Sequence, residues 1–234
     1  IKFAKMNSFE SVEELVTDKT CAVMFETIQG EGGIYPAEKE FMERVKALCE
    51  EKDILLILDE IQCGMGRTGA MYAWQRYGVK PDIMMTAKAL GCGIPVGAFL
   101  MTEHVAANSL VSGDHGTTYG GNPLAGAAIC KVLDLFEEKG IIDHVNRISP
   151  YLEEKLDVLA EKYDMIECRR GTGLMQGLVC KGPVGDIIHK AMEKGLILIN
   201  AGPNIIRIVP PLIIETEHVD EMTDILDKCL AEML

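Results

Sequence analysis

The chain has 234 residues, and its 36 acidic and 23 basic residues give a formal net charge of −13. This balance argues against a nucleic-acid-binding protein, which usually presents a basic face. About half of the residues (48%) are apolar, as in globular proteins, and no apolar run approaches the roughly 18 residues of a membrane-spanning helix.

Short apolar runs alternate with longer helical patterns, and this alternation is typical of an α/β protein. Strands are predicted at residues 20–25, 54–58, 82–86 and 95–101. Five consecutive aliphatic residues at 54–58 indicate a strand that is covered on both faces. Helices are predicted to begin at Pro36, to span residues 72–77, and to follow Pro123, with Leu124 on the apolar side of that last helix.

The pattern changes near residue 140. A helix is predicted there, followed by short strands near 174–179, 196–199 and 205–209 and by a final helix over 219–233. The apolar residues of the first of these helices are Val145, Ile148, Leu152, Leu156 and Leu159. We therefore expect two domains, one at residues 1–139 and a smaller α+β domain at residues 140–234.

Polar residues follow three of the predicted strands. They are Glu26 and Glu31 after the first strand, Asp59, Glu60 and Gln62 after the second, and Lys88 after the third. Ligands of open α/β sheets bind outside the carboxyl ends of the strands, so these residues are expected to gather at one site.

Lys88 and Asp59 are the main candidates for chemistry. Lys88 lies among apolar and small residues, which predicts a desolvated, nucleophilic amine suited to a Schiff base; the alternative is a solvated surface lysine. Asp59 is either a solvated carboxylate at a strand end or a buried anion that pairs with a cation such as the ring nitrogen of pyridoxal. The spacing between the two residues leaves room for one helix and one strand.

Two glycine-rich segments are ambiguous. Residues 64–69 match GxGxxG, which favours an NAD-dependent oxidoreductase. Against this alternative, Asp59 and Glu60 place negative charge where a pyrophosphate would bind, and no acidic residue ends the next strand. Residues 115–123 supply hydroxyls and glycine amides before a helix, which is consistent with a phosphate-binding loop and equally with an ordinary capped loop.

The eight cysteines form no CxxC pair, which predicts reduced thiols that act as small core residues in a cytoplasmic protein. The five histidines show no paired spacing, and no metal site is expected.

Five segments together resemble the class III (ornithine-type) aminotransferases of pyridoxal-phosphate fold type I. They are residues 20–33, 58–69, 86–91, 115–123 and 206–212. The resemblance covers essentially the whole chain. It implies part of the large mixed-sheet cofactor-binding domain (1–139) and the small C-terminal α+β domain (140–234). Because the chain starts at Ile1 within an apparent domain interior, we expect a fragment that lacks the family's N-terminal portion and has little activity alone.

The resemblance also implies roles for four residues at the cofactor, pyridoxal 5′-phosphate. Lys88 would form the Schiff base and carry the proton, and Asp59 would pair with the ring nitrogen. Gln62 would bind the ring hydroxyl. Thr118 would reach the cofactor phosphate of a partner subunit, which implies a homodimer with a shared active site.

For the substrate, the resemblance implies that Thr117 lies beside it and that Arg207 binds a carboxylate, with Glu31 pairing with Arg207 when the amino donor enters. The implied reaction, in arginine biosynthesis, transfers the terminal amino group of N-acetylornithine to 2-oxoglutarate. Ornithine, succinylornithine and 4-aminobutyrate remain alternative donors, and a truncated, non-catalytic partner chain remains an alternative role. Two residues depart from the family pattern: Thr27 replaces a usual proline and Cys92 a common glycine.

Overall fold

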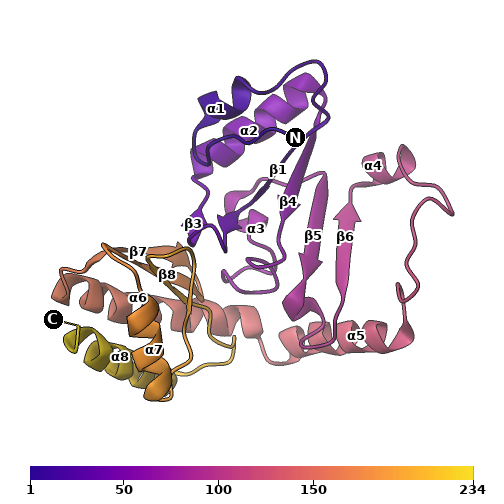
Figure 1. Ribbon diagram of the computed structural model, residues 1–234. Helices are drawn as coiled ribbons and strands as arrows, with labels where there is room; N and C mark the ends of the chain where they lie inside the picture. Colours follow the sequence, from indigo (N-terminus) through magenta and orange to yellow (C-terminus); the bar gives the residue numbers. More distant parts are fainter. Residues whose placement is uncertain (234) are drawn as a thin grey trace. The chain divides into compact units, whose positions relative to one another are not determined.

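The computed structural model describes residues 1–233, and the chain divides into two compact units that each combine helices with a sheet (Figure 1). Unit 1 comprises Ile1–Thr27, Ala37–Met65 and Tyr72–Lys139. Unit 2 comprises Ile28–Pro36, Gly66–Met71 and the chain from Gly140 onward. Two short segments of the first 139 residues, Ile28–Pro36 and Gly66–Met71, therefore belong to unit 2. The division expected from the sequence, at residue 140, had placed both of them in the first domain.

The sheet of unit 1 has the strand order β1-β4-β5-β6. Its strands are β1 (Ala22–Glu26), β4 (Leu55–Asp59), β5 (Ile83–Ala87) and β6 (Gly97–Met101). The first three run parallel, and β6 is antiparallel to β5. All four predicted strands are thus confirmed, with ends that differ by one or two residues.

Six helical segments complete unit 1. They are α1 (Phe9–Glu13), α2 (Lys39–Lys52), α3 (Trp74–Tyr77), the 3-10 turn η1 (Lys88–Leu90), α4 (Glu103–Ala107) and α5 (Pro123–Glu138). The prediction that Pro36 opens a helix was wrong, because Pro36 pairs with Ile28 in a two-stranded ladder and α2 begins at Lys39. The prediction for Leu124 was also wrong, since this residue is 68% exposed.

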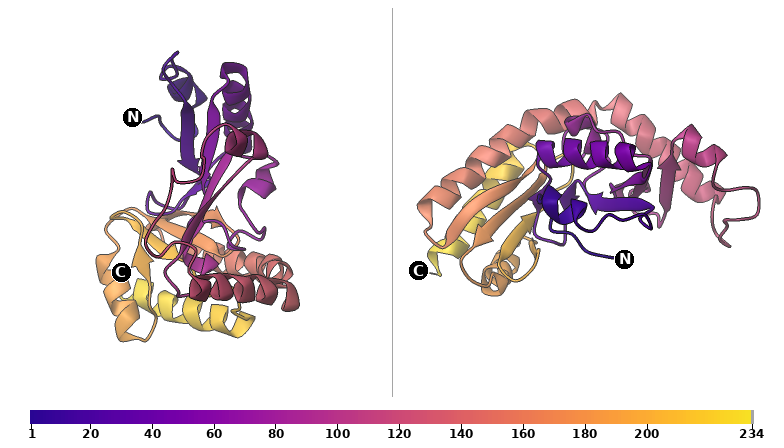
Figure 2. Two further views of the ribbon diagram at one scale, coloured as in Figure 1. Left: turned by 90° about the vertical axis from the view of Figure 1, so that its right-hand side faces the viewer. Right: turned by 90° about the horizontal axis from the view of Figure 1, so that it is seen from above.

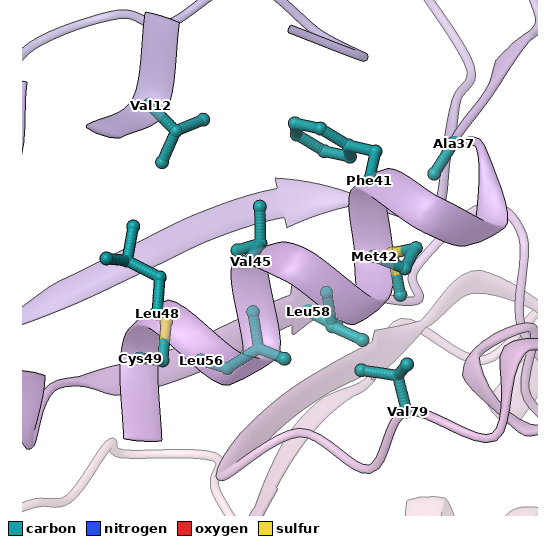
Figure 3. Close-up of a cluster of buried hydrophobic side chains, with 10 residues drawn as sticks. All are labelled: Val12, Ala37, Phe41, Met42, Val45, Leu48, Cys49, Leu56, Leu58 and Val79. Carbon is teal, nitrogen blue, oxygen red and sulfur yellow. The ribbon is translucent and has the colours of Figure 1, made fainter. Parts of the chain in front are cut away.

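The core of unit 1 forms where α1 and α2 cover β4 (Figure 3). Helical spacing places the apolar residues of α2 on one face, and that face packs on Leu56 and Leu58, which are both fully buried. The cluster consists of Val12, Ala37, Phe41, Met42, Val45, Leu48, Cys49, Leu56, Leu58 and Val79. The alternate residues of β4 are only half-buried, so β4 is covered more completely on one face than on the other.

Unit 2 contains an antiparallel sheet with the strand order β7-β8-β10-β9. These strands are β7 (Ile166–Thr172), β8 (Met175–Cys180), β9 (Ile199–Asn200) and β10 (Ile205–Ile208), and its helices are α6 (Ile141–Lys162), α7 (Gly185–Glu193) and α8 (Thr216–Ala231). A separate ladder pairs β2 (Ile28–Gln29) with β3 (Tyr35–Pro36). Helix α6 packs on β7 and runs beside α8 (Figure 2).

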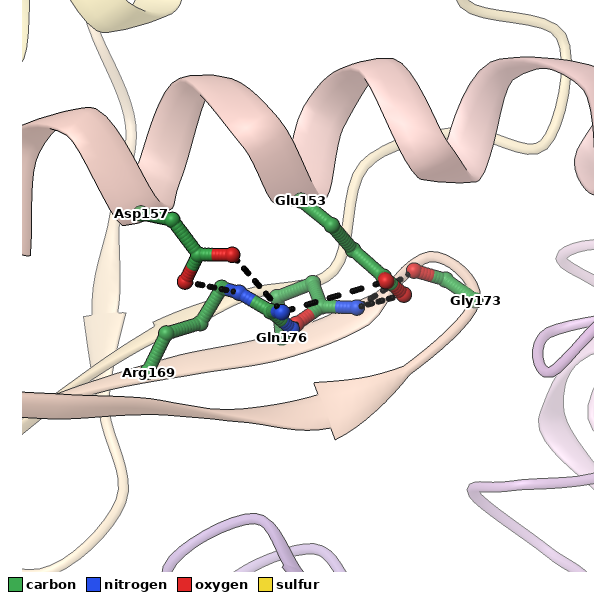
Figure 4. Close-up of polar contacts among 5 residues, drawn as sticks. All are labelled: Glu153, Asp157, Arg169, Gly173 and Gln176. Atoms are coloured by element: carbon green, nitrogen blue, oxygen red, sulfur yellow. Dashed lines mark hydrogen bonds and ion pairs between the residues drawn. The ribbon is translucent and has the colours of Figure 1, made fainter.

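Helix α6 contributes a continuous apolar face to the core of unit 2. All five residues predicted to form its apolar face are buried, and each buried leucine stabilises the fold by about 1.5–3 kcal/mol. A polar network ties the same helix to the sheet (Figure 4). Arg169 of β7 makes a two-pronged contact with Asp157, at 2.7 and 3.0 Å, and the amide of the fully buried Gln176 donates to Glu153 at 3.0 Å.

The cysteines divide evenly between core and surface. Cys49, Cys63, Cys180 and Cys229 are buried, whereas Cys21, Cys92, Cys130 and Cys168 are exposed. All eight are free thiols, so the expectation that they act mainly as core residues holds for only four. None of the helices within residues 1–233 is long and apolar enough to cross a membrane.

Candidate functional site

The carboxyl ends of β1, β4 and β5 meet at one edge of the unit 1 sheet (Figure 1). The register pairs Glu26 with Asp59, and Asp59 with Met85. Lys88 follows β5 directly. The carboxyl ends of these strands therefore meet as predicted, because parallel neighbours end at the same edge. Glu31, which was expected at the same site, belongs to unit 2, within Ile28–Pro36.

Asp59 is the last residue of β4 and is half-buried. Its Oδ1 accepts a hydrogen bond of 2.9 Å from the backbone N–H of Ile61, which fixes the carboxylate at the start of the following turn. The next residue, Glu60, carries the fully buried carboxylate at this strand end and is 0% exposed.

Glu60 joins distant parts of the turn that follows β4. Its carboxylate accepts hydrogen bonds from the backbone N–H groups of Ala73 and Trp74, both at 2.8 Å. The Cys63 thiol lies 3.4 Å from it, and the buried Thr27 hydroxyl lies 3.0 Å from that thiol. Burial raises the pKa of Glu60, while the two backbone hydrogen bonds act in the opposite direction. The sequence indicated Glu60 only as one of the polar residues that follow this strand, and not as a buried structural group.

Lys88 begins η1 with a left-handed backbone (φ +48°) and is exposed. The prediction of a desolvated lysine was therefore wrong. Met84 and Thr86 are the residues of β5 that turn into the protein, whereas Lys88 lies past the end of the strand. A left-handed conformation is disfavoured for a side-chain-bearing residue and is typical of functional sites.

The loop after Lys88 closes tightly at Gly91. A Cβ atom at this position would lie 2.3 Å from the Ile94 carbonyl oxygen, so no other residue fits without a shift of the backbone. Cys92 also has a left-handed backbone (φ +45°). Glycine tolerates this conformation best, which gives a physical reason for the glycine that the family pattern favours there.

Gln62 is half-buried in the turn that follows Asp59. Residues 64–69 continue as turns, with Gly66 at φ +80° and Gly69 at φ +84°, and they open no helix as a dinucleotide-binding turn does. The guanidinium of Arg67, within this segment, donates to the carbonyls of Leu174 and Pro210. The glycine motif thus has a structural explanation.

Thr117 and Thr118 are exposed and precede α5. The side chain of Asn122 caps this helix by accepting the Ala125 N–H at 2.9 Å, and Pro123 has no N–H to offer. The helix terminus is therefore an ordinary capped one, and the hydroxyls of the preceding loop are the groups that remain open to solvent.

Glu31 and Arg207 are brought together in unit 2. Arg207 lies in β10, and its side chain is 10% exposed; its Nη1 lies 2.5 Å from the carboxylate of Glu31. Glu31 itself is 75% exposed. The partners are thus unequal, because the carboxylate regains water when it leaves but the guanidinium does not.

The family model for "Aminotransferase class-III" matches residues 2–230. The chain belongs to the class III aminotransferases. It is 45% identical over 232 residues to the acetylornithine aminotransferase of Methanocaldococcus jannaschii. This match covers 99% of this chain and 58% of that protein. It is 42% identical over 219 residues to the succinylornithine transaminase of Photorhabdus laumondii, which covers 92% of this chain and 54% of that protein.

Among solved structures, the N-acetylornithine aminotransferase of Stenotrophomonas maltophilia K279a superposes with a TM-score of 0.90 at 38% identity. The match covers 99% of this chain and 62% of that one. The predicted family and fold class are confirmed. The chain spans less than two thirds of the length of each of these relatives.

Proposed function

We propose that this chain carries the catalytic lysine and the ring-nitrogen carboxylate of a pyridoxal-phosphate-dependent aminotransferase. The proposed reaction moves the terminal amino group of N-acetylornithine to 2-oxoglutarate, as a step of arginine biosynthesis. The observation that carries the proposal is the position of Asp59 and Lys88 at the ends of adjacent parallel strands in a class III chain.

The residues present fit this cofactor. Pyridoxal phosphate supplies an aldehyde that condenses with amines and a protonated ring that withdraws electrons. An aldehyde calls for a primary amine, which Lys88 offers at an exposed strand end. A protonated ring nitrogen calls for an anion, and the carboxylate of Asp59 is already oriented by the Ile61 N–H.

The chain's own residues then have separate tasks. Lys88 Nζ would take the proton from the substrate carbon that bears the amino group and would then deliver it to C4′ of the cofactor. Asp59 would keep the proton on the ring nitrogen, and Gln62 would donate to the ring hydroxyl. Thr117 would lie against the substrate.

Arg207 and Glu31 would let one site accept two unlike substrates. With the ion pair closed, the Arg207 charge is neutralised, and an amino donor that lacks a second carboxylate is favoured. With Glu31 turned into solvent, Arg207 would bind the second carboxylate of 2-oxoglutarate or glutamate. The exposure of 75% for Glu31 against 10% for Arg207 supports movement of the carboxylate rather than the guanidinium.

We also assign residues 1–139 to the C-terminal part of the large cofactor-binding domain and residues 140–234 to the small domain. Ile28–Pro36 and Gly66–Met71 are the two segments of the first range that pack in unit 2. The proposed enzyme is a cytoplasmic homodimer, in which Thr118 contacts the cofactor phosphate of the partner subunit. The exposure of Thr118 and the eight free thiols support these proposals.

The test is covalent trapping of the cofactor. The full chain is mixed with pyridoxal phosphate and reduced with borohydride, and its peptides are then analysed by mass spectrometry. We expect the cofactor mass on the peptide that contains Lys88, its loss in Lys88→Ala, and its retention in Lys80→Ala, which removes another exposed lysine. Equal labelling of wild type and Lys88→Ala would refute the assignment.

The amino donor is tested separately with a panel of N-acetylornithine, N-succinylornithine, ornithine and 4-aminobutyrate, each paired with 2-oxoglutarate. We expect the highest kcat/KM with N-acetylornithine. A higher value with any other member would reassign the donor and leave the reaction type intact.

A further inference from the structure

The turn at residues 30–34 carries Glu31 in an unusual backbone conformation. Gly33 has φ +108° and Ile34 has φ +51°. The left-handed region is especially unfavourable for a β-branched residue such as isoleucine, so this backbone persists only where its surroundings enforce it.

Packing holds one end of this turn. Ile34 is 0% exposed, and a Cβ atom added to Gly177 of β8 would lie only 3.0 Å from the Ile34 Cβ. The Gly30 carbonyl accepts the N–H groups of Gly33 and Ile34, at 3.3 and 3.4 Å. These bonds close the turn on itself but do not attach it to the sheet.

Arg170 provides that attachment. Its Nε donates to the Gly33 carbonyl at 2.9 Å, and its guanidinium lies 5.2 Å from the centroid of the Tyr35 ring. Successive side chains of a strand point to opposite faces. The preceding residue, Arg169, accordingly contacts Asp157 of α6 instead (Figure 4). Neighbouring arginines of β7 therefore hold different parts of unit 2.

We infer that Arg170 is a positioning residue that determines how strongly Glu31 competes with a substrate carboxylate for Arg207. It fixes the Gly33 carbonyl two residues after Glu31, so that the side chain of Glu31 moves while its backbone stays in place. The inference rests on the proposed function of the Glu31–Arg207 pair. Without Arg170, the turn relaxes, the ion pair forms less often, and Arg207 is more available to dicarboxylates.

The test compares Arg170→Met and Arg170→Lys with the matched control Arg169→Met, in the full chain loaded with pyridoxal phosphate. Lysine keeps the charge but lacks the Nε–H that contacts Gly33, so it remains informative if the methionine variant folds poorly. We expect both Arg170 variants to lower the KM for 2-oxoglutarate and raise the KM for the amino donor. The ratio of the two should change by about tenfold, the size of one lost charge-assisted hydrogen bond, with kcat nearly unchanged. Arg169→Met should leave the ratio unchanged.

A binding measurement provides a readout other than activity. Glutarate, an unreactive dicarboxylate, is titrated into each variant by calorimetry. We expect tighter binding for Arg170→Met and Glu31→Gln but not for Arg169→Met. Because both changes act through one carboxylate, adding Arg170→Met to Glu31→Gln should change glutarate affinity by less than about twofold, as expected for coupled sites.

The outcomes separate the two proposals. If Glu31→Gln shifts the substrate ratio and glutarate affinity while both Arg170 variants behave like Arg169→Met, the inference about Arg170 is overturned and the proposed pair survives. If Glu31→Gln itself changes neither quantity, the proposed role of the pair fails, and the inference fails with it.

Discussion

Removing the carboxylate of Glu60 tests whether this buried group organises the candidate site. In Glu60→Ala, the backbone N–H groups of Ala73 and Trp74 lose their acceptor. The Ala73 N–H lies in a buried contact and the Trp74 N–H in a partly buried one, so water replaces the second bond more readily than the first.

The size of the effect follows from these two bonds. A buried donor without a partner costs about 1–3 kcal/mol, and a part-exposed one costs less. Removal of a desolvated carboxylate, whose pKa is raised by burial, returns part of that cost. We expect Glu60→Ala to lower the free energy of unfolding by about 2–3 kcal/mol, and Glu60→Gln, which keeps one acceptor oxygen, by about half as much.

The pH dependence of stability gives an independent check on Glu60. Its pKa is raised above 4.5 in the folded chain. The contribution of Glu60 to the free energy of unfolding is therefore fully present below pH 4.5, and it is lost as the pH rises through the pKa of the folded state. Glu60→Gln cannot titrate, so over this window its stability should fall less with rising pH than that of the wild type.

Urea unfolding measures both effects in the full chain. Trp74 is the only tryptophan and lies beside Glu60, so its fluorescence reports on unit 1. Glu51→Gln is the control, because this glutamate is exposed. A loss below about 0.5 kcal/mol in Glu60→Ala, the range of ordinary surface changes, would refute the reasoning. So would identical pH slopes in wild type and Glu60→Gln.

Three further predictions also use urea unfolding, followed by Trp74 fluorescence for changes in unit 1 and by circular dichroism for the change in unit 2. Gly91→Ala places a Cβ atom 2.3 Å from the Ile94 carbonyl oxygen and should lower the free energy of unfolding by about 2 kcal/mol or more. Gly116→Ala, where the added Cβ meets open space, should change it by no more than about 0.5 kcal/mol. Equal losses in the two variants would contradict the predicted clash. Cys92→Gly should stabilise unit 1 by up to about 1 kcal/mol by relieving the left-handed backbone, and a clear destabilisation would argue against strain there. Leu152→Ala, at a fully buried site, should cost about 2–5 kcal/mol by circular dichroism, and a cost below 1 kcal/mol would mean that the cavity collapses.

The helical periodicity of the sequence was reliable where the buried face is continuous. The five apolar residues predicted in α6 are all buried because this long helix packs on β7 and β8 and against α8. Strand β7 escaped prediction for the opposite reason. Its polar residues include Arg169 and Arg170, whose partners lie on α6 and on the turn at 30–34. A strand stabilised by such long-range polar contacts lacks the apolar alternation on which prediction depends.

At the candidate site, the sequence predicted which strand ends meet but not how exposed their residues are. The adjacency of Asp59 and Lys88 follows from the topology of parallel strands. The exposure of Lys88 depends on where the strand ends. Its left-handed backbone could not be predicted, because lysine, unlike glycine, does not indicate this conformation. The sequence placed Glu60 at this strand end but did not reveal its structural role, because two of its partners are backbone N–H groups of residues 73 and 74, which no side-chain motif reveals.

The glycine motif at residues 64–69 shows why a local pattern is weak evidence for a ligand. A Cβ atom on Gly173 would lie 2.6 Å from the Arg67 carbonyl oxygen, and the Leu174 N–H donates to that same oxygen at 2.9 Å. Two backbone segments thus approach within hydrogen-bonding distance inside unit 2, and glycine is needed on one side of that contact and at the turns on the other. The close approach of a backbone to a phosphate imposes the same demand. Sequence alone therefore cannot distinguish a nucleotide-binding turn from a crossing of two chain segments, whereas the position of Gly173 can.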